Sequence, residues 1–177
     1  GVSSKTSVGY FISKYKAEQI IINSGLNYTI FRPSYIVGKD DLFTKFLKKQ
    51  IKIKTIEIPG SGKYSIQPIS INDVVKIIFQ SFNEIKFKNK ICDLVGPDYL
   101  TFEQYVKLFC KGSKIKIKKI NLETAYYDAI NNKNSNFGID DLNILVGDFK
   151  GNYNQLEKIT QIKFESVVEL LKSGRLL

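Results

Sequence analysis

Hydrophobic and polar residues follow two different periods along the chain, and segments of the two kinds alternate. Spacings of three and four residues, typical of one face of a helix, predict helices over residues 10–23, 40–50, 74–82, 101–110 and 122–131, with two more after residue 136, the last near 164–171. Short runs rich in Ile, Val, Tyr and Phe predict extended segments at 28–31, 56–58, 64–69, 90–95 and 115–120. The alternation indicates an α/β fold rather than a helical bundle or a β-sandwich.

Glycines and capping residues mark the ends of the predicted helices. Gly25 follows the first helical segment and predicts a left-handed stop. Asp40 and Asp41 can cap the second helix, and Asp73 is expected to be both the N-cap of the third helix and an anchor between parts of the fold. Residues 101–104, Thr-Phe-Glu-Gln, are a capping box that opens the fourth helix.

The predicted strands are too few for a complete doubly wound sheet. Parallel strands are normally buried on both faces and need neighbours on both edges. The sequence also contains no methionine, and no glycine-rich phosphate loop precedes the first helix. We therefore expect the chain to be the back part of a longer α/β protein, whose N-terminal half would supply the other strands.

The composition is that of a folded protein in a reducing compartment. The 177 residues are 43% hydrophobic, which is enough for a core. Cys92 and Cys110 are too few and too poorly spaced for a disulfide framework or a zinc site, so we expect a cytoplasmic setting and no metal. No apolar run approaches the ~18–20 residues of a membrane span, and none is expected.

Histidine is absent, and this excludes several classes of catalytic site. A Ser-His-Asp triad, a Cys-His dyad and a His-ligated metal cannot be built from these residues. A general acid or base must therefore be Tyr, Lys, Asp, Glu or a water molecule.

The net charge of +10 raises the question of an anionic partner. Only Arg32 and Arg175 among the 27 basic residues are arginines, whereas base and phosphate recognition favours Arg. A solvated lysine-rich surface is therefore favoured over nucleic-acid binding. The lysine-rich strand at 114–119 has two interpretations, an edge strand guarded by Lys or a site that attracts an anionic substrate such as a nucleotide diphosphate.

Tyr10 and Lys14 are the strongest candidates for chemistry. They lie one helical turn apart on one face of the first predicted helix, where an ammonium group favours a phenolate. Ser3 or Ser4, just upstream at the end of a predicted strand, can hydrogen-bond a substrate carbonyl. On spacing alone an ordinary amphipathic helix, with a core Tyr and a surface Lys, is the favoured explanation of the pair. Tyr35 and Lys39 have the same spacing but straddle a loop.

Several segments in order make the first interpretation more specific. Residues 2–4 (Val-Ser-Ser), Tyr10, Lys14 and Glu18 precede a distinctive run at 24–38, which reads Ser-Gly-Leu-Asn-Tyr-Thr-Ile-Phe-Arg-Pro-Ser-Tyr-Ile-Val-Gly. Together they resemble the short-chain dehydrogenase/reductase superfamily in its extended or atypical branch. That branch includes sugar-nucleotide epimerases and dehydratases and the reductase-like accessory subunits of respiratory complex I.

The resemblance continues through most of the chain. Residues 58–62 and 67–75 resemble the segment where such proteins return from the substrate lobe, and residues 96–103 resemble the start of a late helix in the complex I-like members. The resemblance implies that residues 1–177 are the C-terminal portion of a Rossmann-type NAD(P)-binding domain plus a small substrate-binding lobe, without the N-terminal dinucleotide-binding half. The implied cofactor is NAD or NADP.

The resemblance also implies roles for individual residues. Tyr10 would be the acid–base residue, Lys14 would assist its ionisation and hold the nicotinamide ribose, and Ser4 (or Ser3) would polarise the reacting group. The other implied contacts are Pro33, Ser34 and Tyr35 with the nicotinamide, and Ser3 and Gln67 with the substrate.

The implied function is that of an NAD(P)-dependent oxidoreductase or epimerase/dehydratase acting at an alcohol or ketone carbon, with a sugar nucleotide as one candidate substrate and a homodimer as one candidate assembly. The alternative is a catalytically inactive NAD(P)-binding regulatory or assembly subunit. Two departures from the family pattern keep it open, the missing glycine-rich loop and the short spacer between Ser4 and Tyr10. We expect the isolated chain to be inactive.

Overall fold

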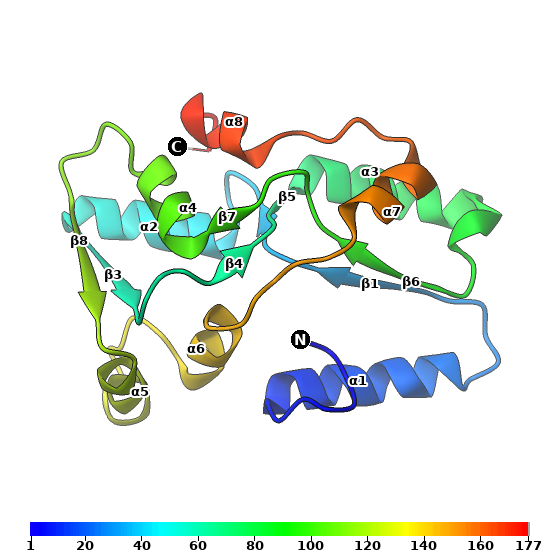
Figure 1. Ribbon diagram of the computed structural model, residues 1–177, viewed down its shortest axis with the longest axis horizontal. Helices are drawn as coiled ribbons and strands as arrows, with labels where there is room; N and C mark the ends of the chain where they lie inside the picture. Colours follow the sequence, from blue (N-terminus) through cyan, green and yellow to red (C-terminus); the bar gives the residue numbers. More distant parts are fainter. Residues whose placement is uncertain (177) are drawn as a thin grey trace.

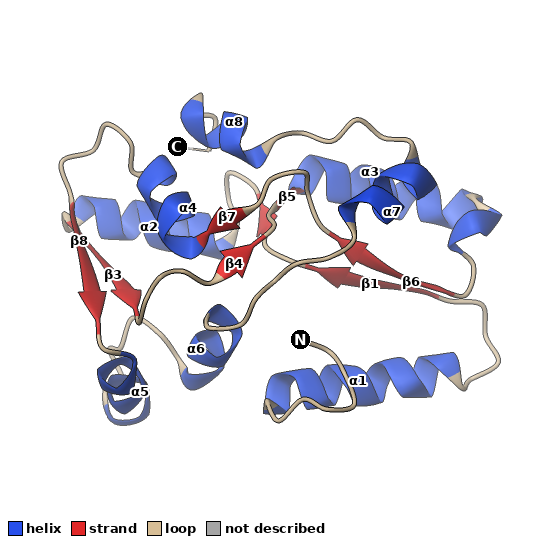
Figure 2. Cartoon of the chain, viewed as in Figure 1, coloured by secondary structure: helices blue, strands red, loops and turns tan. Residues whose placement is uncertain are grey.

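The computed structural model describes residues 1–176 and has an α/β architecture, as predicted. Four strand pairs are linked by helices (Figure 2). The pairs are β1 (Thr29–Pro33) with β6 (Lys90–Leu94), β2 (Ile36–Val37) with β5 (Ile69–Ser70), β3 (Thr55–Pro59) with β8 (Lys116–Ile120), and β4 (Ser65–Ile66) with β7 (Leu100–Thr101). The first three pairs are parallel and the fourth is antiparallel.

Eight α-helices of the described chain surround these strands. They are α1 (Gly9–Ile22), α2 (Leu42–Lys52), α3 (Ile71–Asn83), α4 (Phe102–Phe109), α5 (Leu122–Asn131), α6 (Ile139–Leu145), α7 (Tyr153–Thr160) and α8 (Val167–Lys172), with a short 3-10 helix η1 (Ile85–Phe87). The sequence predicted two helices after residue 136, but the structure has three. These helices, α6, α7 and α8, have only seven, eight and six residues, so a helical period does not count them reliably.

The elements fall into two regions (Figure 1). We call β1, β6, α1, α3 and α7 the β1–β6 region, and β3, β8, α2, α4, α5, α6 and α8 the β3–β8 region. The short pairs β2–β5 and β4–β7 lie between them. No helix among residues 1–176 has both the length and the hydropathy to cross a bilayer.

Alternate residues of β1 point to opposite faces of the β1–β6 pair, which determines where the helices pack. Phe31 packs with Ile77 of α3 and Leu156 of α7 in one buried cluster. The next residue, Arg32, points to the other face and binds α1 through Glu18. The pair is therefore covered by helices on both sides, as a parallel sheet requires.

The β3–β8 region has a densely packed core of its own. Ile56 and Ile58 of β3 are 1% and 0% exposed, and they pack with Leu47 of α2 and with Phe102 and Phe109 of α4. The capping box predicted at 101–104 is present, because the Thr101 hydroxyl accepts from Gln104 N and the Gln104 amide accepts from Thr101 N.

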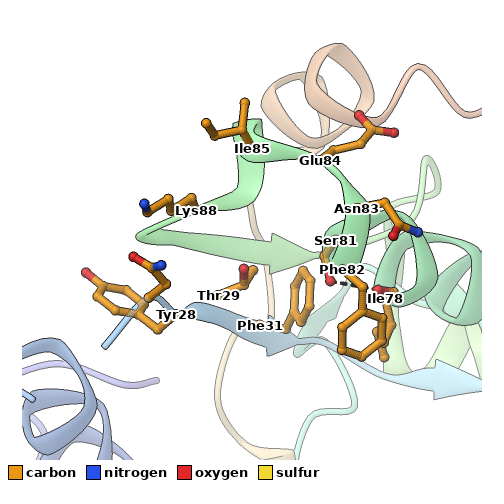
Figure 3. Close-up of a pocket in the computed structure, with 11 residues that line it drawn as sticks. Tyr28, Thr29, Phe31, Ile78, Ser81, Phe82, Asn83, Glu84, Ile85 and Lys88 are labelled. Carbon is orange, nitrogen blue, oxygen red and sulfur yellow. Dashed lines mark hydrogen bonds between the residues drawn. The ribbon is translucent and has the colours of Figure 1, made fainter. Parts of the chain in front are cut away.

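Neither outer edge of the β1–β6 pair has a neighbour among the described strands, because β1 and β6 pair only with each other. A cavity of about 540 Å³ lies beside this pair (Figure 3). It is lined by Tyr28 and Phe31 on the strand side and by Ile78 and Phe82 on the helix side. Phe82 is 80% exposed, so apolar surface of α3 is uncovered at this point.

The helix caps are as predicted at α2 but not at α3. The Asp41 carboxylate accepts from Thr44 N at 2.9 Å and caps α2. The N-cap of α3 is Ser70, whose hydroxyl accepts from Asn72 N, so the assignment of Asp73 as N-cap is wrong. Two neighbouring side chains were able to cap this helix, and Ser70 is the one at the residue where the backbone is still extended.

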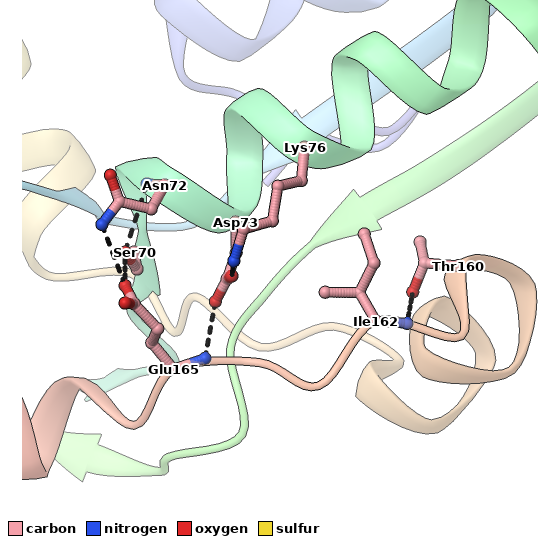
Figure 4. A network of polar contacts seen from close by, with 7 residues as sticks. All are labelled: Ser70, Asn72, Asp73, Lys76, Thr160, Ile162 and Glu165. Atoms are coloured by element: carbon pink, nitrogen blue, oxygen red, sulfur yellow. Dashed lines mark hydrogen bonds and ion pairs between the residues drawn. The ribbon is translucent and has the colours of Figure 1, made fainter.

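The prediction that Asp73 is an anchor is confirmed (Figure 4). The carboxylate is fully buried and accepts from Glu165 N at 2.7 Å and from Lys76 Nζ at 3.0 Å. The Glu165 carboxylate in turn accepts from the Ser70 hydroxyl at 2.5 Å and from Asn72 Nδ2 at 3.2 Å. This network ties the segment between α7 and α8 to the start of α3.

The lysine-rich strand β8 is an edge strand in the described sheet, paired only with β3. Lys116 and Lys118 are exposed. Lys118 pairs with Glu57 at 3.5 Å and Lys119 with Glu103 at 2.8 Å. Carboxylates of the chain itself therefore neutralise part of this charge, which favours the edge-strand interpretation over an anion site.

Candidate functional site

Tyr10 and Lys14 lie in the first turns of α1, where the i, i+4 spacing places them on one face of the helix. The Lys14 ammonium nitrogen is 5.3 Å from the centroid of the Tyr10 ring, and so lies over the aromatic face. The Tyr10 ring is 40% exposed and rests edge-on against Phe11 at 5.3 Å. The phenol is thus held by packing from one side and open to a ligand from the other.

The second part of the site is the loop that follows β1. Pro33 ends the strand, and Ser34 and Tyr35 come next. Ser34 N donates to Leu94 O at 3.1 Å and the Ser34 hydroxyl donates to Phe149 O at 3.2 Å, so the turn is fixed at both ends. Ligands of α/β proteins bind outside the carboxyl ends of parallel strands, which is where this loop lies.

One cavity of about 640 Å³ joins these two parts. The predicted residues that line it are Tyr10, Lys14, Pro33, Ser34 and Tyr35. A volume of this size is typical of sites for small molecules and cofactors. We call it the site cavity.

The far wall of the site cavity was not predicted. It comes from Phe43 of α2, Ile144 of α6 and Phe149 in the loop before α7. The Phe149 ring is 5.7 Å from that of Tyr35 and 6.1 Å from that of Phe11, and it brings the loop, α1 and the C-terminal part of the chain together. Phe149 lies far along the chain between two predicted helices, and nothing in its local sequence marks it as part of a site.

An ion pair that the sequence did not predict holds α1 against β1. Arg32 Nε donates to Glu18 Oε1 at 2.9 Å and Nη2 donates to Oε2 at 2.6 Å, which is the two-point geometry of a strong pair. The hydrogen bond to Glu18 raises the pKa of Arg32 above its usual value. The available signal was Arg32 directly after the apolar run 28–31. The buried partner is Glu18, whose carboxylate requires an opposite charge in the fold.

Ser3 and Ser4 do not lie at the end of a strand. Residues 1–8 contain none, and Ser3 O accepts from Thr6 N in a turn. Both serines are exposed, and neither lines the site cavity, although Val2 does. The prediction of a strand here is wrong because an extended segment needs a paired neighbour, and none of the described strands pairs with this segment.

Gln67 also lies outside the site cavity. It is fully buried; its Nε2 donates to Gly96 O at 2.9 Å and its Oε1 accepts from Gly151 N at 3.0 Å. A Cβ at Gly96 would lie 2.1 Å from Pro68 O, so only glycine permits this close approach. These bonds give Gln67 a role in joining three loops beneath the site.

Tyr35 differs from Tyr10 in its surroundings. Burial, with a smaller contribution from the charge of Asp141, raises the pKa of Tyr35 above its usual range. The Tyr35 ring packs edge-on against Phe43 and Phe149 and forms part of the cavity wall. No cluster of His, Cys, Asp and Glu within residues 1–176 is suited to hold a metal ion.

Neither a protein-family model nor a curated protein matches the sequence. Solved structures match the fold. UDP-glucose 4-epimerase from Thermotoga maritima has a TM-score of 0.69 and 18% identity over 94% of this chain and 52% of its own. dTDP-glucose 4,6-dehydratase from Bacillus anthracis in complex with NAD has a TM-score of 0.68 and 14% identity over 98% and 56%. RMD from Pseudomonas aeruginosa complexed with NADPH has a TM-score of 0.63 and 14% identity over 93% and 53%.

The chain thus has the fold of the C-terminal part of Rossmann-type epimerases and dehydratases, as predicted. It spans about half the length of these proteins.

Proposed function

We propose that this chain supplies the acid–base residue and the nicotinamide end of the site in an NAD(P)-dependent enzyme that acts at an alcohol or ketone carbon. The site cavity carries the proposal, because it joins Tyr10 and Lys14 with the loop 33–35 at the carboxyl end of a parallel strand. The match to epimerase and dehydratase folds, two of them with NAD or NADPH bound, supports the same assignment.

In the oxidising direction the Tyr10 phenolate accepts the proton of the substrate hydroxyl as the carbon loses a hydride. The phenol returns that proton to the carbonyl oxygen in the reverse reaction. NAD(P), when bound, supplies the hydride acceptor and donor. The Lys14 ammonium lies over the Tyr10 ring and can donate to a ribose hydroxyl. Pro33 and Tyr35 exclude water from the nicotinamide side.

Epimerisation and dehydration both begin with this step, so the same residues serve either reaction. Sugar nucleotides are one candidate substrate class, since the similar structures include a UDP-glucose epimerase and a dTDP-glucose dehydratase.

The proposal includes a partner for the uncovered face of the β1–β6 region. The free edge of β1 can pair with a further parallel strand, and a helix from the same unit would cover Phe79 and Phe82 of α3. That unit would be the dinucleotide-binding half of the fold and would bind the cofactor pyrophosphate.

A cofactor-binding subunit without turnover is the second candidate function. It is favoured by one observation, that Ser3 and Ser4 lie outside the site cavity, so neither of the two serines expected to polarise a carbonyl lies beside Tyr10.

The test is Tyr10→Phe in the longest polypeptide that carries this chain, assayed for cofactor-dependent turnover. Loss of the acid–base group should lower kcat by about a hundredfold or more while cofactor affinity changes little. Tyr15→Phe, on the same helix but outside the cavity, is the matched control and should retain full activity. Unchanged turnover in Tyr10→Phe removes this residue from the mechanism. Cofactor binding without turnover in the unmodified protein supports the second candidate.

A further inference from the structure

A second cavity, of about 370 Å³, opens beside the site cavity within the β3–β8 region. Its walls are mainly aromatic and come from α2, α4 and the loop before α6; they include Phe43, Phe46, Phe102 and Phe137. The Phe46 ring is 6.4 Å from Phe43 in a stacked arrangement and 5.7 Å from Phe137. We call it the aromatic cavity.

The two cavities share part of their lining. Tyr35, Leu42, Phe43 and Ile144 line both. A substrate whose reacting carbon lies at Tyr10 can therefore place its other end against the aromatic walls. The aromatic cavity is then the specificity subsite of the site cavity.

The polar groups of the aromatic cavity are already engaged within the fold. The Asp141 carboxylate accepts from Gly138 N at 2.9 Å. The Asn136 amide bonds to Gln50 at 3.3 Å and to Glu57 at 3.4 Å. These groups fix the loop before α6, and they leave few donors for a ligand.

The charges around the two cavities do not suit a diphosphate. None of the described residues lining the aromatic cavity is basic, and Asp141 places a negative charge there. In the site cavity the lining cations are Lys14 and Arg32, and Arg32 is bound to Glu18. The N-terminus of α2, which could hold a phosphate, is occupied by its own cap, Asp41.

We propose that the substrate is an uncharged, largely hydrophobic ketone or alcohol, whose aromatic or aliphatic ring system occupies the aromatic cavity. The inference rests on the proposed function, because it assigns the reacting carbon to Tyr10. It departs from the sugar nucleotides of the similar structures, because a pyrophosphate bound here would face Asp41 and Asp141 with few cations to offset them.

The test is a direct binding measurement with a neutral aromatic ketone. We choose 4-fluorobenzophenone, observed by ¹⁹F NMR, with UDP-glucose and UDP as competitors. The ketone should bind, and neither nucleotide should displace it. Stronger binding of UDP-glucose, or no binding of the ketone, overturns the proposal.

A pair of matched variants locates the binding. Leu42 lies at the rim of both cavities, is 86% exposed and begins α2, where an acidic residue favours the helix. Leu42→Glu should therefore fold, and a charge at the rim should weaken ketone binding by about tenfold. Leu26→Glu is the control, because Leu26 is 72% exposed and lies outside both cavities; it should change the affinity by less than about twofold. Equal effects of the two variants overturn the proposal.

This binding requires neither cofactor nor catalysis, so it fails or succeeds separately from the proposed function. If turnover is unchanged in Tyr10→Phe while the unmodified protein binds the ketone, the proposed function is contradicted and the cavity assignment stands. If Tyr10→Phe loses turnover but the unmodified protein does not bind the ketone, only the cavity assignment is contradicted.

Discussion

The β1–β6 region and the β3–β8 region are each built on a parallel strand pair, but the strands at the free edges of the two pairs differ in their residues. The outer strand β8 carries Lys116, Lys118 and Lys119, and a row of lysines keeps an exposed edge from pairing with other chains. The strand β1 reads Thr-Ile-Phe-Arg-Pro and has no lysine, although one of its edges is also open among the described strands. The residues of β8 therefore suit a permanent edge, whereas those of β1 suit an internal strand.

The helices of the two regions show the same contrast. In α4, of the β3–β8 region, Phe102, Val106 and Phe109 are all buried at 2% exposure or less. In α3, of the β1–β6 region, Phe79 and Phe82 are 71% and 80% exposed. Apolar surface of this kind is typical of interfaces. The core of the β3–β8 region is therefore closed, whereas α3 of the β1–β6 region presents an apolar face to the partner proposed above.

The largest effect expected from this comparison is on stability. Phe109→Ala leaves a cavity in the closed core and should lower the free energy of unfolding by about 3–5 kcal/mol. Phe82→Ser removes an aromatic ring of similar size from the open face and should change it by about 0.5 kcal/mol or less. Urea denaturation of the two variants and the unmodified chain measures both values.

The longer polypeptide provides the control for that pair. If a further strand and helix cover α3 there, Phe82→Ser should cost about 2–4 kcal/mol in that context, close to the value for a core position. If Phe82→Ser lowers the free energy of unfolding of this chain by several kcal/mol, Phe82 is already packed here. If it lowers this free energy little in both this chain and the longer polypeptide, the exposed face of α3 has no partner.

Local sequence patterns predicted the parts of the fold that depend on near neighbours. The capping box at Thr101, the left-handed Gly25 with φ of +77° and the pairing of Tyr10 with Lys14 on one face each depend on residues at most four apart. Two capping candidates stood close together at the start of α3, and local sequence did not separate Ser70 from Asp73.

The parts that were missed depend on distant contacts. Phe149 reaches the site cavity because the C-terminal loop crosses back over β1, and its backbone oxygen accepts from a serine 115 residues away. Gln67 is a joint between loops because Gly96 and Gly151 approach it from different segments. No periodicity within a short window encodes these contacts. The resemblance to known proteins named residues 33–35, which line the site cavity, and their contacts with a nicotinamide stay a prediction.

An intermediate effect is expected at the attachment of α1, the element that carries Tyr10. Glu18→Gln retains the shape of the side chain but removes the charge that pairs with Arg32. The free energy of unfolding should therefore fall by about 2 kcal/mol. Hydrogen exchange should show faster exchange throughout α1 and unchanged protection in α4. Glu57→Gln is the control, since its partner Lys118 is 56% exposed, and it should cost a few tenths of a kcal/mol, about 0.3. Equal loss of protection in both helices would contradict a separate attachment of α1.

The smallest effect expected is at the seam between the two regions, and it depends on pH. Glu165 lies between α7, which packs on β6, and α8, which packs on α4, and its carboxylate holds the start of α3. The hydrogen bond from the Ser70 hydroxyl lowers the pKa of Glu165 below its usual value, and Asn72 and the charge of Lys76 act in the same direction.

A lowered pKa means that the ionised form is favoured in the folded state. The stabilisation is therefore fully present above the unfolded value of about 4.3, and it is lost as the pH falls through the lower folded value. Glu165→Gln should reduce the free energy of unfolding by about 1 kcal/mol at pH 7, and the difference from the unmodified chain should shrink steadily between pH 5 and pH 3. Glu169→Gln, four residues on and 64% exposed, should show little change at either pH. A difference for Glu165→Gln that is independent of pH would mean that the side chain acts through its shape and not through its charge.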